Sequence, residues 1–170
     1  MRKSLTLVCA GCVMVSRIFL RRFAGDEYLP AKGQPAIVAA NHSSLFDGVT
    51  LCAELTWRTH RPMHPLVTRE AFAPPFSGWI LRSTQAVPID RRDPRDTENA
   101  LRTLLGYLGR GEQVTIFPEG HLNNGQTMRL PRPGMALLAL ESGAPVIPCG
   151  LRGTAEAFPV GGRPRLGRRV

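Results

Sequence analysis

The sequence is poor in aromatic residues and almost free of lysine. Aromatic side chains make up 6% of its 170 residues, so we expect a mainly aliphatic core. Only two of the 22 basic residues are lysines; the others are arginines, whose planar fork can hold phosphate through two hydrogen bonds. The formal net charge of +9 suggests nucleic acid, an anionic membrane or a phosphorylated ligand as a partner, and a solubilising surface is the alternative.

Several binding classes lack their sequence signals. Aromatic and basic residues do not alternate as they do in single-strand binders, and no zinc-finger or RNA-recognition pattern is present, so nucleic acid is not an expected partner. Cys9 and Cys12 form a CxxC pair without a second pair nearby. The four histidines show no ligand spacing. We therefore expect no metal, no cofactor and no disulfide, and a reducing compartment.

No apolar run near the N-terminus is long enough to cross a bilayer. The stretch over residues 5–15 falls well short of the roughly 20 residues that a spanning helix needs. Instead, we expect residues 1–28 to contain a membrane-associating interfacial helix, with Arg17, Arg21 and Arg22 turned toward phospholipid headgroups. A signal peptide and an ordinary core helix are the alternatives. The expected location is the cytoplasmic face of a membrane.

Short apolar runs alternate with helical patterns along the rest of the chain. Strands are predicted over residues 35–40, 64–68, 86–90, 113–117 and 146–151. Helices are predicted over 47–55, 95–108 and 133–142. This alternation predicts an α/β domain over residues 29–160, with a mostly parallel central sheet flanked by helices. A basic tail over residues 161–170 is expected to be poorly ordered.

The first strand runs directly into the sequence NHSSLFDG, which begins at Asn41. His42 can accept a proton near neutral pH, and a carboxylate from Asp47, one turn of chain away, would orient its imidazole. Ser44 and Asp47 equally fit a helix-capping box, which is a structural alternative to catalysis.

Three further motifs follow, two of them at predicted strand ends. They are PIDRR with Arg91 and Arg92, FPEG over residues 117–120, and APVIP over residues 144–148. Taken singly, they predict a solvated edge, a tight turn and a core strand. Since parallel strands place their carboxyl ends at one edge of the sheet, their joint occurrence favours a shared active site.

The four motifs in this order resemble those of the glycerolipid acyltransferases, which include the lysophosphatidic acid acyltransferases. The resemblance covers residues 29–154 and implies the family's α/β fold. It implies that His42 is the general base and that Asp47 is its orienting partner. It also implies that Arg91 binds the acceptor phosphate and that Glu119 and Gly120 take part in acceptor binding.

The implied function is transfer of a fatty acyl group from acyl-CoA or acyl-carrier protein to the hydroxyl of a lysophospholipid such as 1-acylglycerol-3-phosphate. One alternative is an acyltransferase acting on a lipid without phosphate, such as an acylated amino acid. Another is a catalytically silent acyl- or lipid-binding fragment, suggested by the end of the chain soon after the fourth motif. The sequence does not predict an oligomeric state.

The sequence departs from the family pattern at two motifs. Gln85 replaces the usual glycine before the second motif. His121 and Leu122 follow FPEG, where the family usually has threonine and arginine. We therefore expect Arg91 to be the main phosphate anchor and the third-motif loop to bind phosphate weakly, unless Arg129 or Arg132 replaces the arginine.

Overall fold

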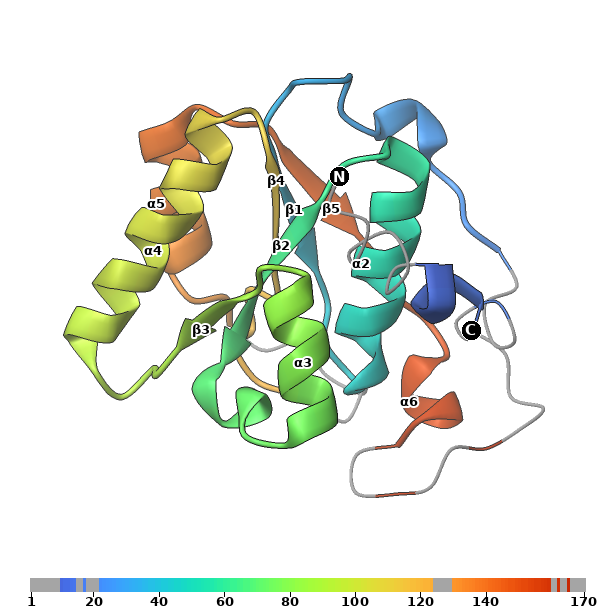
Figure 1. The fold of residues 1–170 in the computed structure, drawn as a ribbon. Helices are drawn as coiled ribbons and strands as arrows, with labels where there is room; N and C mark the ends of the chain where they lie inside the picture. Colours follow the sequence, from blue (N-terminus) through green and yellow to red (C-terminus); the bar gives the residue numbers. More distant parts are fainter. Residues whose placement is uncertain are drawn as a thin grey trace.

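The computed structural model describes residues 10–14, 17, 22–123, 130–159, 162 and 165. These residues form an α/β domain around a parallel sheet of five strands in the order β3-β2-β4-β1-β5 (Figure 1). The strands are β1 (Ala36–Ala40), β2 (Met63–Thr68), β3 (Val87–Ile89), β4 (Gln113–Ile116) and β5 (Val146–Cys149). The predicted parallel sheet is confirmed, and each strand lies within two residues of its predicted ends.

Helices and short 3-10 segments connect the strands. The helices are α2 (Phe46–Thr59), α3 (Pro75–Ser83), α4 (Pro94–Gly109), α5 (Gly134–Ser142) and α6 (Thr154–Ala157). The 3-10 segments are η1 (Asp26–Tyr28) and η2 (Arg69–Phe72). The three predicted helices correspond to α2, α4 and α5. The sequence analysis did not predict α3, whose two aromatic side chains, Phe76 and Trp79, are exposed.

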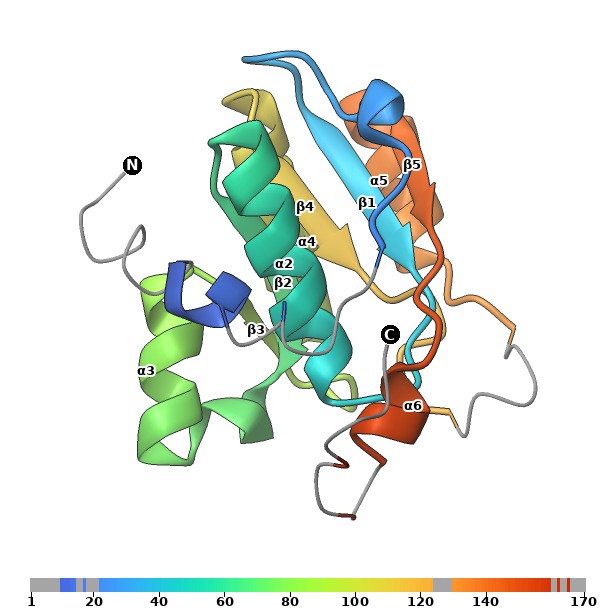
Figure 2. The ribbon, with the colours of Figure 1, turned by 90° about the vertical axis from the view of Figure 1, so that its right-hand side faces the viewer.

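Successive residues of β1 point into two separate aliphatic cores, as the alternation of side chains along a strand requires. Ile37 packs with Leu104 and Leu108 of α4, and with Leu138 of α5. Val38 faces the opposite layer, which α2 covers with Leu51 and its neighbours. Figure 2 shows α2 in front of the sheet and α4 behind it. The sheet is thus packed between two helical layers, and the loops that follow its strands are the places where a site can form.

The N-terminal helix prediction lies partly outside the described residues. Residues 10–14 and 17 are helical; Val13 is buried, and Nε of Arg17 lies 3.4 Å from Glu54 Oε1 on α2. Within the described parts of the chain, no helix is long and apolar enough to span a membrane. All but residues 162 and 165 of the predicted tail lie outside the described residues.

Candidate active site

The motif residues gather at the carboxyl edge of the sheet, as predicted for parallel strands. The paired strands β1 and β4 run into the loops of His42 and of residues 117–120. The pairing of Thr68 with Ile89 aligns β2 with β3, so η2 lies beside the loop that carries Arg91. The sheet itself therefore brings together side chains that are far apart in the sequence.

His42 and Asp47 form the pair that the first motif predicts. Nδ1 of His42 lies 3.1 Å from Oδ2 of Asp47, whose carboxylate is fully buried. The His42 ring also stacks on Phe117, with 4.0 Å between the ring centroids. Because the carboxylate engages Nδ1, the predicted role of His42 as a general base would fall to the other ring nitrogen, Nε2.

The capping alternative is confirmed only in part, because the N-cap residue of α2 is Leu45 and not Ser44. Oδ2 of Asp47 accepts hydrogen bonds from the backbone N–H groups of Ser43 and Ser44, at 2.7 and 2.8 Å. The side chain of Ser44 accepts instead from the N–H of Phe46, so the reciprocal capping box is incomplete. One carboxylate therefore orients His42 and fixes the turn into α2 at the same time.

Glu119 holds the third-motif loop against the first. Its side chain is buried, and Oε1 accepts the backbone N–H of His42 at 3.1 Å. Oε2 accepts a hydrogen bond from Asn123, whose own backbone N–H donates to the carbonyl of His42 at 2.9 Å. Glu119 thus supports the backbone of His42; its predicted contact with the acceptor remains a prediction.

Asn41 was not predicted as a site residue, yet it joins the ends of β1 and β5. Its amide donates to the carbonyl of Leu151 at 2.9 Å and accepts the N–H of the same residue at 2.6 Å. Ser43 and Ser44 extend this connection, through Oγ contacts to Thr154 Oγ1 at 3.1 Å and to the Phe158 carbonyl at 2.7 Å. The feature of the sequence that could have marked Asn41 as a site residue is its position directly before His42.

Replacing Asn41 by alanine should loosen this end of the sheet. The substitution leaves the N–H and the carbonyl of Leu151 without their side-chain partner, which typically costs about 1–3 kcal/mol for buried groups. We expect denaturant unfolding to show a loss in this range, together with lower activity because the His42 loop begins at Asn41. An unchanged unfolding midpoint would contradict this role.

A basic cluster lies at the same edge and consists of Arg91, His121 and Arg132. Nη1 of Arg91 lies 3.2 Å from Nδ1 of His121, and Nη2 of Arg132 lies 2.9 Å from Nε2 of the same ring. Partial burial, together with the nearby charge of Arg132, lowers the pKa of Arg91. Arg132 thus lies close to Arg91, and its replacement of the missing arginine of the third motif stays a prediction. Arg129 lies outside the described residues.

Gly120 is the point where the third motif accommodates this cluster. Its φ of +67° lies in the left-handed region, and a Cβ at this position would stand 2.7 Å from Nε of Arg132. Arg132 is also held by its own backbone N–H, which donates to the carbonyl of Pro118 at 2.8 Å. Glycine is needed here both for the turn and for the approach of the arginine.

Gly120→Ala should therefore displace Arg132 and strain the turn. We expect a loss of about 1–2 kcal/mol in unfolding free energy, the usual cost of a left-handed residue with a Cβ, and a higher KM for the acceptor. Gly109→Ala is the matched control, because a Cβ there would meet nothing within 4 Å. Equal effects of the two substitutions would show that the close approach of Arg132 has no consequence.

Comparison with known proteins places these motifs in a wider context. The chain is 29% identical to a chloroplastic 1-acyl-sn-glycerol-3-phosphate acyltransferase of Arabidopsis thaliana, over 81% of this chain and 37% of that protein. It is 33% identical to a 1-acyl-sn-glycerol-3-phosphate acyltransferase of Pseudomonas aeruginosa, over 73% and 46% of the two chains. A lyso-ornithine lipid O-acyltransferase of the same organism is 31% identical, over 81% and 50%. The chain thus spans half or less of the length of these relatives.

A solved structure and a family model match this chain as well. The crystal structure of the 1-acyl-sn-glycerophosphate acyltransferase PlsC from Thermotoga maritima superimposes with a TM-score of 0.73 at 22% identity, over 93% of this chain and 61% of that one. At this identity the likeness concerns the fold alone. The model of the acyltransferase family matches residues 21–152, which is most of the sequence. The resemblance predicted from the four motifs is thereby confirmed, and the chain belongs to the acyltransferase family.

Proposed function

We propose that this protein transfers a fatty acyl group from a thioester donor to the free hydroxyl of a lysophospholipid whose headgroup carries phosphate. The observation that carries the proposal is the position of the His42–Asp47 pair at the same sheet edge as the basic cluster. A base and an anion-binding group on one edge suit an acceptor that has both a hydroxyl and a phosphate. We place the reaction at the cytoplasmic surface of a membrane, where such acceptors lie.

The proposed reaction is a direct transfer that needs no cofactor. Nε2 of His42 takes the proton of the acceptor hydroxyl while that oxygen attacks the thioester carbonyl. The tetrahedral intermediate then collapses, the carbon–sulfur bond breaks, and the imidazolium returns its proton to the leaving thiolate. The buried carboxylate of Asp47 stabilises the imidazolium between these steps and keeps the ring in the required orientation.

The basic cluster would bind the phosphate of the acceptor. A neutral imidazole has only one acceptor nitrogen, so the His121 ring cannot accept from Arg91 and Arg132 together. A phosphate group offers several acceptor oxygens and can satisfy both guanidinium forks through charge-assisted hydrogen bonds. We infer that Arg91 and Arg132 share the phosphate, in place of the arginine that the third motif lacks.

A second candidate is transfer to a lipid without phosphate. It is favoured by Leu122, which stands where the family usually has an arginine, and by the similarity to a protein named lyso-ornithine lipid O-acyltransferase. Both candidates use the same base and thioester donor. They differ only in the acceptor group that the basic cluster contacts. In both, the donor is acyl-CoA or acyl-carrier protein.

An acceptor panel with labelled acyl-CoA and labelled acyl-carrier protein tests the proposal. We expect purified protein to acylate 1-acylglycerol-3-phosphate faster than its dephosphorylated form and faster than a lyso-ornithine lipid. Preference for the lyso-ornithine lipid would support the second candidate. Binding of acyl donor without turnover of any acceptor would instead indicate a catalytically silent lipid-binding protein.

A further inference from the structure

The outer face of α3 carries aromatic side chains where a surface helix normally carries polar ones. Phe76 is 75% exposed and Trp79 is 54% exposed, and the two lie three residues apart on one side of the helix. The fully buried residue of α3 is a glycine, Gly78, which packs on the carbonyl of Phe72 in η2. The helix thus turns its smallest residue inward and two of its largest outward, at the cost of exposing apolar area.

This face lies next to the candidate active site. The carboxyl end of β2 leads into η2 and then into the first turn of α3, so Phe76 lies at the catalytic edge of the sheet. Glu70 of η2 is close enough to Arg91 to raise the pKa of that guanidinium, although burial and Arg132 lower it overall. Figures 1 and 2 both show η2 beside the first turn of α3.

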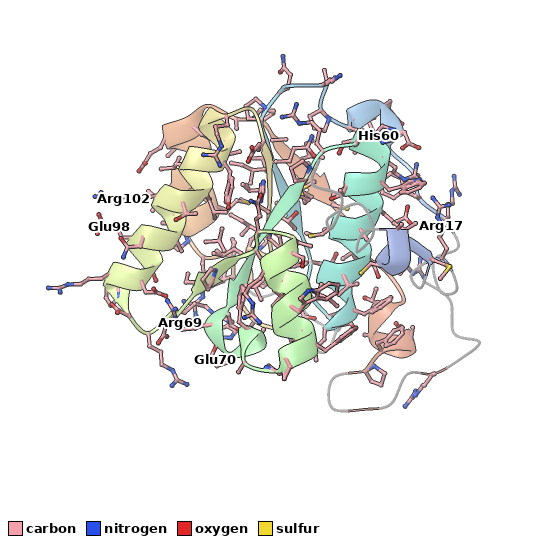
Figure 3. All side chains as sticks on the ribbon, viewed as in Figure 1. Arg17, His60, Arg69, Glu70, Glu98 and Arg102 are labelled. Carbon is pink, nitrogen blue, oxygen red and sulfur yellow. The ribbon has the colours of Figure 1, made fainter. Side chains whose placement is uncertain are left out.

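A third apolar side chain lies at the same edge. Leu45 directly precedes α2 and is 72% exposed, three residues after His42. Figure 3 shows Arg69 and Glu70 of η2 at one end of the molecule and His60, which follows α2, at the other. Leu45 and Phe76 lie at the end that carries the site, because α2 and α3 both begin there, and Trp79 follows Phe76 by about one turn of α3. We call these three exposed residues the apolar rim.

The charges around the apolar rim suit an anionic surface. Arg82 in the last turn of α3 is exposed, as are Arg92 and Arg95 beyond β3. Glu70 and Asp93 are exposed acids of the same region, and the chain as a whole has a formal net charge of +9. Tryptophan and phenylalanine flanked by arginine are typical of helices that lie in the headgroup layer of a membrane.

We propose that the apolar rim binds the surface of an anionic lipid bilayer, with Phe76 and Trp79 in the headgroup layer and the active site facing the lipid. This binding surface is distinct from the N-terminal helix predicted over residues 1–28. It rests on the proposed function in one respect, because a lipid acceptor explains why the site should face a bilayer. With the rim in the headgroup layer, the acceptor reaches the site without crossing water.

The two tryptophans of the chain provide a direct test, since Trp79 belongs to the apolar rim on α3, whereas Trp57 lies in the last turn of α2, away from the catalytic edge where that helix begins. Trp57→Phe leaves Trp79 as the only indole, and Trp79→Phe leaves Trp57. With vesicles of phosphatidylglycerol and phosphatidylcholine, Trp79 emission should shift to the blue, and brominated acyl chains should quench it. Trp57 should show neither effect. Equal behaviour of the two indoles, or a blue shift of Trp79 with protein concentration alone, would overturn the proposal, the latter in favour of a second copy.

Sedimentation with the same vesicles provides the second measurement. Trp79→Ser combined with Phe76→Ser should weaken partitioning about tenfold or more, since burying one aromatic side chain is worth roughly 1.5–3 kcal/mol. Trp57→Ser, a change of an indole that is 44% exposed, should leave partitioning unaltered. Because neither experiment measures turnover, inactivity on every acceptor would refute the proposed function and leave these results valid. Equal partitioning of the double variant and the parent protein would refute the membrane proposal alone.

Discussion

Replacing His42 by alanine is expected to reduce acyl transfer by about 10²–10⁴-fold, the usual contribution of a general base. The reason is that Nε2 of this ring is the group proposed to take the hydroxyl proton, while Asp47 holds Nδ1 at 3.1 Å. Steady-state turnover with saturating donor and acceptor measures the effect. The loss should appear mainly in kcat, because the imidazole acts on the reacting atoms.

His60→Asn is the matched control for this substitution. His60 ends α2 at the opposite edge of the sheet, and its φ of 54° is a conformation that asparagine tolerates. We expect its turnover and unfolding midpoint to match those of the parent protein. His42→Ala should also unfold cooperatively, although it loses the stacking on Phe117. Near-normal turnover of His42→Ala would disprove the proposed mechanism.

Asp47→Asn should impair activity and stability together. The amide no longer provides the negative charge that stabilises the imidazolium, and the change also alters the group that accepts the N–H groups of Ser43 and Ser44. Unfolding must therefore be measured beside turnover. If turnover at a temperature where the variant is fully folded equals that of the parent, then Asp47 acts only as a cap.

Removal of the two arginines of the basic cluster should abolish the preference for a phosphorylated acceptor. A hydrogen bond to a charged group is worth about 1.5–3 kcal/mol, so Arg91→Ala and Arg132→Ala should each weaken acceptor binding by roughly 10- to 150-fold. The reaction with the dephosphorylated acceptor should remain nearly unchanged. If both guanidinium groups contact one phosphate, the two substitutions should be coupled. The loss of acceptor affinity in the double variant should then differ from the product of the two single losses.

Arg92→Ala is the control for charge. Arg92 is exposed and adjacent to Arg91, so its removal changes the net charge equally without removing a member of the basic cluster. We expect a small effect on both acceptors, which falls with added salt. Equal losses on the phosphorylated and dephosphorylated acceptors in Arg91→Ala would mean that this arginine is structural.

Much of the architecture could be predicted from the sequence because buried strands and surface helices have strong local signals. Residues 35–40 form a continuous apolar run, which predicts a buried strand. The leucines of α4 recur every three or four residues, which predicts a helix with one buried face. His42 and Asp47 could be paired because they are only five positions apart in the chain. Contacts of this short range depend on local backbone geometry, which the sequence encodes directly.

The longer-range partners of the site residues were decided by the tertiary structure. Arg132 approaches His121 across the loop of the third motif, and Asn41 meets Leu151 only because β5 pairs with β1. No period or spacing in the sequence marks such contacts, since the first depends on the path of a long loop and the second on the order of the strands in the sheet. The aromatic face of α3 escaped prediction for the same reason: a sequence pattern identifies apolar residues, whereas only the packed fold determines whether they point to the core or to the outside.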